Sequence, residues 1–213
     1  MMGGMADATH GFDKDYWEEH WQDDGGHDRE VPPHPYLATE VADLAPGTAL
    51  EAGCGEGAEA LWLAERGWQV TAADISSAVL ARAADRARGS AAGDRVSWVE
   101  ADVSTWDPGR QFDLVSTHYA HPATTQLDFY RRLATWVAPG GTLLVVGHLH
   151  EDAAGHGHHH PPEASVTADS VVASLDAEEW EVVTAAEPER TVNPGADHEI
   201  RLRDVVVRAV RRA

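Results

Sequence analysis

A glycine-rich segment, Glu51-Ala52-Gly53-Cys54-Gly55-Glu56-Gly57, follows a short apolar stretch and precedes a helical one. Glycines let the backbone turn sharply and lie against a ligand with no Cβ in between. The helix behind the turn offers free N–H groups and the positive end of its dipole. Asp74 lies 21 positions after Gly53, close to the roughly 20 at which an acid binds ribose hydroxyls. The pattern predicts a site for a ligand that contains ribose.

A dinucleotide-dependent oxidoreductase is the rival interpretation, because Gly53, Gly55 and Ala58 also satisfy the looser G-x-G-x-x-G/A pattern. An acid precedes the glycines, a third glycine stands at position 57, and a further acid follows the third predicted strand. Glu51 would suit a cationic ammonium group better than a pyrophosphate. These features argue against a nicotinamide cofactor without removing that alternative.

The surrounding sequence alternates between short apolar strands and amphipathic helices, which predicts a mainly parallel sheet with right-handed crossovers. Two further strands near the C-terminus have only a turn-rich segment between them, so we expect an antiparallel hairpin. The predicted strands are 48–51, 69–74, 96–100, 112–117, 142–148, 180–187 and 200–210, and the predicted helices are 36–44, 58–66, 76–88 and 126–137.

Glu51-x-Gly53-x-Gly55-x-Gly57 resembles the E/D-x-G-x-G-x-G signature of class I S-adenosylmethionine-dependent methyltransferases. Asp74 is similar to the family's ribose-binding acid. Glu100-Ala101-Asp102-Val103 resembles the segment that contacts adenine, and Pro139-Gly140-Gly141-Thr142-Leu143 the turn into the fifth strand. The resemblance covers about residues 35–150. Tyr16-Trp17 and Leu63–Gly67 are similar to the thiopurine and tellurite-resistance branch, whose members methylate small molecules.

The resemblance implies a Rossmann-like three-layer α/β/α sandwich, with a seven-stranded, mostly parallel sheet and an antiparallel last strand. The composition of residues 1–30 predicts a tail with an aromatic helix, which the resemblance makes a lid, and residues 31–213 are expected to form the methyltransferase domain. The resemblance also implies S-adenosylmethionine as cofactor, bound by Trp17, Glu51, Gly53, Cys54, Gly55, Asp74, Ile75, Asp102, Val103 and Thr117.

Ligands of open α/β sheets bind beyond the carboxyl ends of the strands, so residues that follow the fourth predicted strand should face the reacting methyl group. A phenol or a protonated amine needs a base, and histidine has a suitable pKa. His118 and His121 are therefore the candidate bases, with polar lining as the alternative. Tyr16, Trp21, Tyr119 and His148 are the candidate substrate contacts. The acceptor stays open among thiol, hydroxyl, halide and metalloid.

Six histidines gather at 148–160, which leaves a second alternative, a metal-binding or resistance protein on a methyltransferase scaffold. Their spacing matches no closed zinc site, so no metal is expected. The net charge of −20 repels phosphate backbones and anionic membranes, which argues against nucleic-acid and membrane partners. A single cysteine and the absence of a signal peptide or membrane segment predict a cytoplasmic protein. The oligomeric state stays open.

Overall fold

The computed structural model describes residues 12–23, 32–90, 92–149, 166–195 and 198–213. The helices are α1 (Lys14–Asp23), α2 (Pro35–Glu40), α3 (Ala58–Glu65), α4 (Ser77–Ala87), α5 (Gln126–Thr135) and α6 (Ala168–Ala173), with a short 3-10 turn at Gly93–Arg95. The strands are β1 (Thr48–Ala52), β2 (Gln69–Asp74), β3 (Val96–Glu100), β4 (Phe112–His118), β5 (Val137–His148), β6 (Trp180–Ala186), β7 (Glu189–Gly195) and β8 (His198–Arg211).

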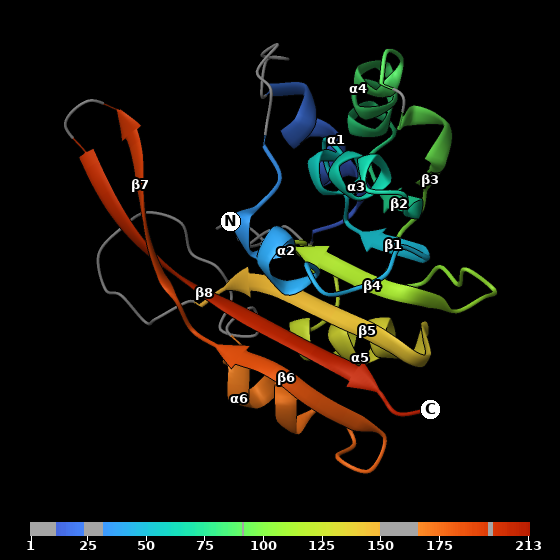
Figure 1. Cartoon of the computed structure of the whole chain (residues 1–213). Coiled ribbons are helices and arrows are strands. Elements are labelled where there is room, and N and C mark those ends of the chain that lie inside the picture. The colour runs from blue at the N-terminus through green and yellow to red at the C-terminus, as the bar shows by residue number, and fades with distance from the viewer. Residues whose placement is uncertain (1–11, 24–31, 91, 150–165, 196–197) are drawn as a thin grey trace, which may run out of the picture.

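The strands form one twisted sheet in the order β3-β2-β1-β4-β5-β8-β6 (Figure 1). Neighbours among β1 to β5 are parallel, whereas β8 runs antiparallel to both β5 and β6. The mostly parallel sheet with an antiparallel last strand is confirmed, but β7 also pairs with β8, so the sheet has eight strands and not the predicted seven. The chain reverses direction across the sheet between β1 and β4, and such a switch point opens a crevice at the carboxyl ends of the strands.

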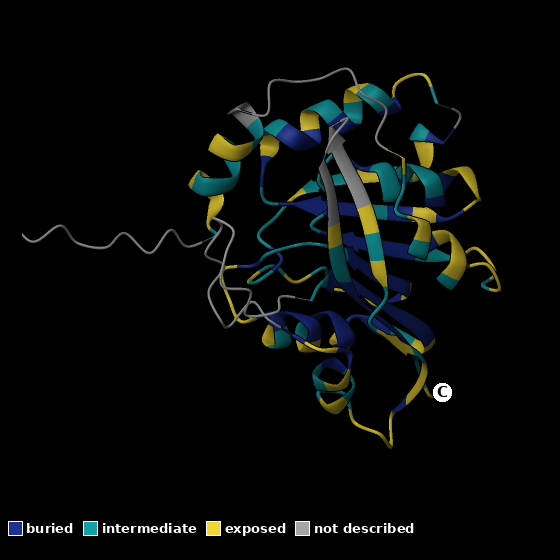
Figure 2. Cartoon of the chain, turned by 90° about the vertical axis from the view of Figure 1, so that its left-hand side faces the viewer, coloured by how far each residue is buried: buried dark blue, intermediate teal, exposed yellow. Residues whose placement is uncertain are grey.

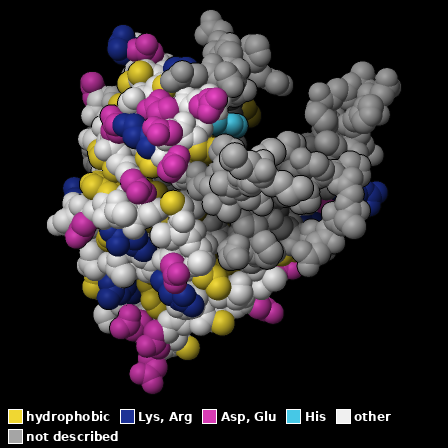
Figure 3. All heavy atoms as spheres, turned by 180° about the vertical axis from the view of Figure 1, so that it is seen from behind, with side chains coloured by type: hydrophobic (Ala, Val, Ile, Leu, Met, Phe, Trp, Pro, Cys, Tyr) yellow, Lys and Arg dark blue, Asp and Glu magenta, His cyan; other side chains and the backbone are white. Residues whose placement is uncertain are grey.

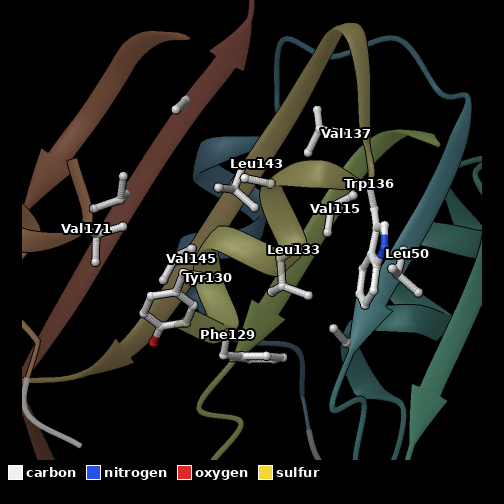
Figure 4. Packing of buried hydrophobic residues seen from close by; sticks show 14 of the residues in the cluster. Leu50, Val115, Phe129, Tyr130, Leu133, Trp136, Val137, Leu143, Val145 and Val171 are labelled. Carbon is white, nitrogen blue, oxygen red and sulfur yellow. The ribbon is translucent and has the colours of Figure 1, made fainter. Parts of the chain in front are cut away.

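Alternating side chains of the strands face opposite sides of the sheet, as the period of two requires. Leu50 and Val115 belong to the cluster under α5 and α6, whereas Ala49 and Leu114 belong to the one under α2 and α3. Figure 4 shows the first cluster, in which Leu133 of α5 lies among residues of β4 and β5. Burial is therefore greatest in the middle strands (Figure 2), and the three-layer sandwich is confirmed.

The structure differs from the sequence prediction in several bounds, and it adds α6, which was not predicted. Residues 189–195 form β7, which pairs with the first half of β8 (Glu189↔Arg203), where we expected turn residues alone. Asn193, Pro194 and Gly195 resemble turn formers, yet this edge strand tolerates them because only one of its sides must pair. Helix α5 ends at Thr135 instead of continuing to 137, because Val137 already pairs with Phe112. The β7–β8 hairpin extends away from the body of the sheet (Figure 1).

Acidic and basic side chains are interspersed over the face seen from behind (Figure 3), so the acidic surplus does not form one patch there. In the part of the chain that the structure describes, no helix is long and apolar enough to cross a membrane. The division into residues 1–30 and 31–213 stays a prediction.

Candidate active site

A cavity of about 510 Å³ lies at the carboxyl ends of β1, β2 and β4, within the roughly 300–1,000 Å³ of small-molecule sites. Its lining joins residues far apart in the sequence. Those include Phe12, Trp17 and Trp21 of the N-terminal segment, His34, the turn Gly53–Glu59, Asp74-Ile75, Asp102–Ser104 and His118–Ala123.

The glycine turn has the left-handed backbone that its sequence predicts, with φ values of 71°, 49° and 77° at Gly53, Gly55 and Gly57. A Cβ at Gly53 would lie 2.5 Å from that of Ala120, and one at Gly57 would lie 2.4 Å from the ring of Trp98. These two glycines are therefore required both by conformation and by close packing.

Four N–H groups of this turn donate hydrogen bonds to acceptors within the protein. Gly53 and Cys54 bond to the carbonyl of Ala73, Gly55 to the Asp74 carboxylate, and Gly57 to the carbonyl of Cys54. A pyrophosphate would need such groups free. Glu59 and Asp74 also line the cavity, and negative charges there favour a cation over a dinucleotide; Glu56 is paired with Arg82 and Arg86. The geometry therefore disfavours the nicotinamide alternative.

The cavity fits the parts of S-adenosylmethionine that the motifs imply. The Asp74 carboxylate accepts hydrogen bonds from the N–H groups of Gly55 (2.9 Å) and Ser76 (3.0 Å), and each oxygen keeps a lone pair for a ribose hydroxyl. Asp102 and Val103 line the cavity at the neighbouring strand end, where adenine would lie. Burial raises the pKa of Asp74 above its usual value. Keeping its carboxylate charged in this place therefore costs folding free energy, and such perturbed groups are common at binding sites.

Glu51 lies beneath the cavity and is committed to two partners on β4. One of its oxygens lies 2.8 Å from Nδ1 of His118, and the other accepts a hydrogen bond from the Ser116 hydroxyl. The side chains of Glu51 and His118 are 1% and 4% exposed. Burial opposes a charged ring, but the carboxylates of Glu51 and Glu59 outweigh it and raise the pKa of His118. Glu51, the acid of the glycine motif, therefore has His118 and Ser116 as its hydrogen-bond partners.

Tyr119 follows β4 in the left-handed region, with φ of 55°, a conformation that costs a non-glycine residue about 1–3 kcal/mol. Its hydroxyl lies 3.0 Å from Nε2 of His34, whose Nδ1 accepts from the N–H of Tyr36. Burial lowers the pKa of His34 to about 4, so this ring is neutral and donates from Nε2. Burial also raises the pKa of Tyr119 well above its usual value. Tyr119 therefore keeps its proton.

Residues of the β7–β8 hairpin hold Tyr119 from the other side. Nε of Arg190 donates to the fully buried Asp204 carboxylate at 2.6 Å, and the guanidinium lies 5.5 Å from the centre of the Tyr119 ring. The ring of His148 packs on Tyr119 at 4.3 Å, with its Nδ1 3.5 Å from Asp204. The added strand β7 thus supports Tyr119, which lines the cavity, from behind.

Helix α1 contributes Trp17 and Trp21 to the lining of the cavity, and its role as a lid stays a prediction. The carboxylate of Glu18 accepts hydrogen bonds from the N–H of Ser77 (2.8 Å) and from the hydroxyls of Ser76 and Ser77 at the N-terminus of α4. Arg82 donates to the carbonyl of Trp21 at 2.7 Å. Trp21 in turn lies over Gly55. A carboxylate at a helix N-terminus also gains from the helix dipole.

Glu18→Gln is expected to loosen α1. Burial opposes the charge on Glu18, but its bonds to Ser77 and Ser76 lower the pKa below 4.5. This contribution is present above pH of about 4.5 and is lost as the pH falls through the lowered value. Hydrogen exchange in residues 14–23 should become about 2- to 5-fold faster in the variant, the effect of losing a cap contact of about 0.5–1 kcal/mol.

The matched control is Glu19→Gln, since Glu19 is exposed on the same helix. Equal exchange in both variants and the wild type would show that the Glu18 contacts do not hold the helix.

The structure brings most of the predicted site residues to one cavity. Those that line it are Trp17, Trp21, Gly53, Cys54, Gly55, Asp74, Ile75, Asp102, Val103, His118, Tyr119 and His121. Tyr16, Glu51, Thr117 and His148 lie behind the lining. Thr117 is buried and donates to the carbonyl of Ala52, and Tyr16 packs on Phe12. Burial raises the pKa of the Cys54 thiol, so it stays protonated. His150–His160 lie outside the described residues.

Sequence reasoning missed Phe12, His34, Glu59, Arg190 and Asp204. Phe12 stacks on His121 at 5.5 Å, and its spacing of four from Tyr16 was a usable signal. Glu59 has the position of an ordinary acidic residue in the first turn of a helix, so its sequence context does not indicate a role in the site. Nothing local marks the other three, because tertiary contacts alone bring them to the site.

Comparison with known proteins agrees with this geometry. Residues 49–141 match a family of methyltransferase domains. Trans-aconitate 2-methyltransferase of Streptomyces avermitilis is 35% identical over 54% of this chain and 45% of its own. Thiocyanate methyltransferase 1 of Arabidopsis thaliana is 32% identical over 46% and 44%. The chain thus spans about half the length of these curated relatives.

A solved structure from work on the conversion of a disulfide bond into a thioacetal group during echinomycin biosynthesis has the same fold. It superposes with a TM-score of 0.70 at 22% identity, over 93% of this chain and 91% of that one. The glycine turn with its acids, the strand order and the matched domain lead to one conclusion. Residues 49–141 form a methyltransferase domain, in a chain that has the fold of class I S-adenosylmethionine-dependent methyltransferases.

Proposed function

We propose that this protein transfers a methyl group from S-adenosylmethionine to a small-molecule acceptor, and that the acceptor atom is the sulfur of a thiol. The observation that carries the proposal is the shared cavity, which joins the cofactor turn and Asp74 to the segment His118–His121 under an aromatic cover. When bound, S-adenosylmethionine supplies an electrophilic methyl group on a positively charged sulfur.

The residues of the chain act by binding, orientation and exclusion of water. Asp74 orients the ribose, and Asp102 with Val103 borders the adenine. Trp17 and Trp21 cover the cavity, and the stacked rings of Phe12 and His121 form its outer wall. Holding the acceptor in line at near-contact distance supplies much of the acceleration in a displacement. An enclosed site also prevents water from competing.

Two lines of support favour sulfur. The cavity wall is largely aromatic and apolar, which suits a soft, weakly hydrated acceptor. The thiocyanate methyltransferase relative and the thioacetal-related structure bear names from sulfur chemistry. The exclusion of nucleic acid still rests on the net charge of −20 alone.

Release of S-adenosylhomocysteine tests this proposal. The panel comprises small thiols, iodide, tellurite, phenols and a short RNA, each with S-adenosylmethionine at pH 7.5. We expect thiols to give at least about tenfold higher kcat/KM than phenols, a difference of about 1.4 kcal/mol in transition-state free energy, and RNA to give no release. Turnover of phenols or RNA above thiols would contradict the thiol assignment, and no release with any acceptor would contradict methyl transfer to these classes.

A further inference from the structure

The Glu51–His118 pair has an arrangement that methyl-donor binding by itself does not explain. Both oxygens of the Glu51 carboxylate are engaged by β4, one by Ser116 and the other by Nδ1 of His118. His118 lines the cavity, and its Nε2 is buried without a hydrogen-bond partner among the described residues. A buried polar atom without a partner is costly, so its retention beside the cavity indicates a function.

The sheet register places these groups together. Glu51 pairs with Ser116 across β1 and β4, and His118 follows Ser116 by two residues, so all three side chains lie on one face. Glu59 of α3 adds a second negative charge from above, and the neutral His34 lies near the ring. The proton on Nδ1 of His118 is therefore held towards Glu51, which leaves the lone pair of Nε2 for the cavity.

We propose that His118 is the base that removes the proton of the acceptor thiol, and that Glu51 is the positioning residue that orients the ring. The proposal rests on the proposed methyl transfer and deepens it. The S–H bond breaks with its electron pair left on sulfur, and an N–H bond forms at Nε2. The thiolate sulfur then bonds to the methyl carbon, whose bond to the donor sulfur breaks with its pair. The products are a thioether and S-adenosylhomocysteine, and the proton leaves His118 for solvent.

This arrangement follows the logic of carboxylate–histidine catalysis, in which an acid fixes the tautomer of a base and stabilises its charged form. The acids Glu51 and Glu59 outweigh burial in raising the pKa of His118. Because the neutral ring is the active form, thiol methylation should fall as the pH drops through that pKa.

The first test is a pH titration of the protein labelled with ¹³C at the histidine Cε1 positions and followed by NMR. His118→Gln identifies the His118 signal among the 13 histidines. We expect a midpoint above 6.5 in the wild type and a decrease of about 1–3 units in Glu51→Gln, the effect of removing a charge in contact. Glu51→Asp keeps the charge and should keep most of the shift. Glu65→Gln, an exposed acid of α3, is the control and should leave the midpoint unchanged.

The second test is the pH profile of thiol methylation, whose acid limb should move in Glu51→Gln in the same direction as the NMR midpoint. If far-UV circular dichroism shows that Glu51→Gln does not fold, Glu59→Gln replaces it, with a smaller decrease expected. If the His118 midpoint does not move in Glu51→Gln while S-adenosylhomocysteine release stays normal, the proposed role of the Glu51–His118 pair is overturned, but the proposed methyl transfer is not. If Glu51→Gln instead binds S-adenosylhomocysteine with a higher Kd and leaves the His118 midpoint unmoved, the role of Glu51 is to bind the cofactor, and the proposal is overturned. No release by the wild type would contradict the proposed function itself.

Discussion

Asp74→Ala is expected to weaken the binding of S-adenosylhomocysteine by about 100-fold or more, measured by isothermal titration calorimetry. The substitution removes the acceptor for the N–H groups of Gly55 and Ser76 together with the expected ribose contacts. Hydrogen bonds to a charged group contribute about 1.5–3 kcal/mol each. The loss of two such bonds from the ribose hydroxyls therefore exceeds the roughly 2.7 kcal/mol that a 100-fold change in affinity requires. Because burial already raises the pKa of Asp74, its removal should cost binding more than stability.

The control is Asp107→Ala. Asp107 is also an acid in a turn, accepting from the N–H of Gly109 at 2.9 Å, but it is exposed and lies outside the cavity. We expect unchanged affinity in this variant. If folded Asp74→Ala protein bound within about threefold of the wild type, a difference under 1 kcal/mol, Asp74 would have no direct part in the site.

Leu133→Ala is expected to lower the free energy of unfolding by about 2–5 kcal/mol, the range for a buried leucine that leaves a cavity. Leu133 of α5 has no exposed surface and packs into the cluster with Val115 and Val137 (Figure 4). A domain has about 5–15 kcal/mol in all, so this single change should move the urea midpoint strongly.

Val183→Ala on the edge strand β6 is the matched control. Val183 is 50% exposed, and surface changes of this kind remain within about 0.5 kcal/mol. A loss below about 1 kcal/mol in Leu133→Ala would mean that the cluster under α5 relaxes to fill the space, contrary to close packing of the core.

The cofactor end of the site is local in origin, so the sequence alone determined it. The left-handed turn at Gly53–Gly57 needs glycine, and strand β2 places Asp74 directly opposite it. Turn conformation, period-two alternation and helix caps such as Ser76 depend on residues a few positions apart. The same reasoning gave the parallel sheet and its antiparallel β8, since short connections leave few topologies.

The arrangement around His118 and Tyr119 was decided only by tertiary structure. The contact between Glu51 and His118 joins residues 67 positions apart, and it depends on the register of β1 against β4. A shift of one residue would turn His118 to the other face. Arg190 reaches Tyr119 because β7 pairs with β8, a pairing that the turn-forming residues 193–195 concealed. Strand register and edge pairing are set by the packing of the whole sheet, and no local pattern in the chain specifies them.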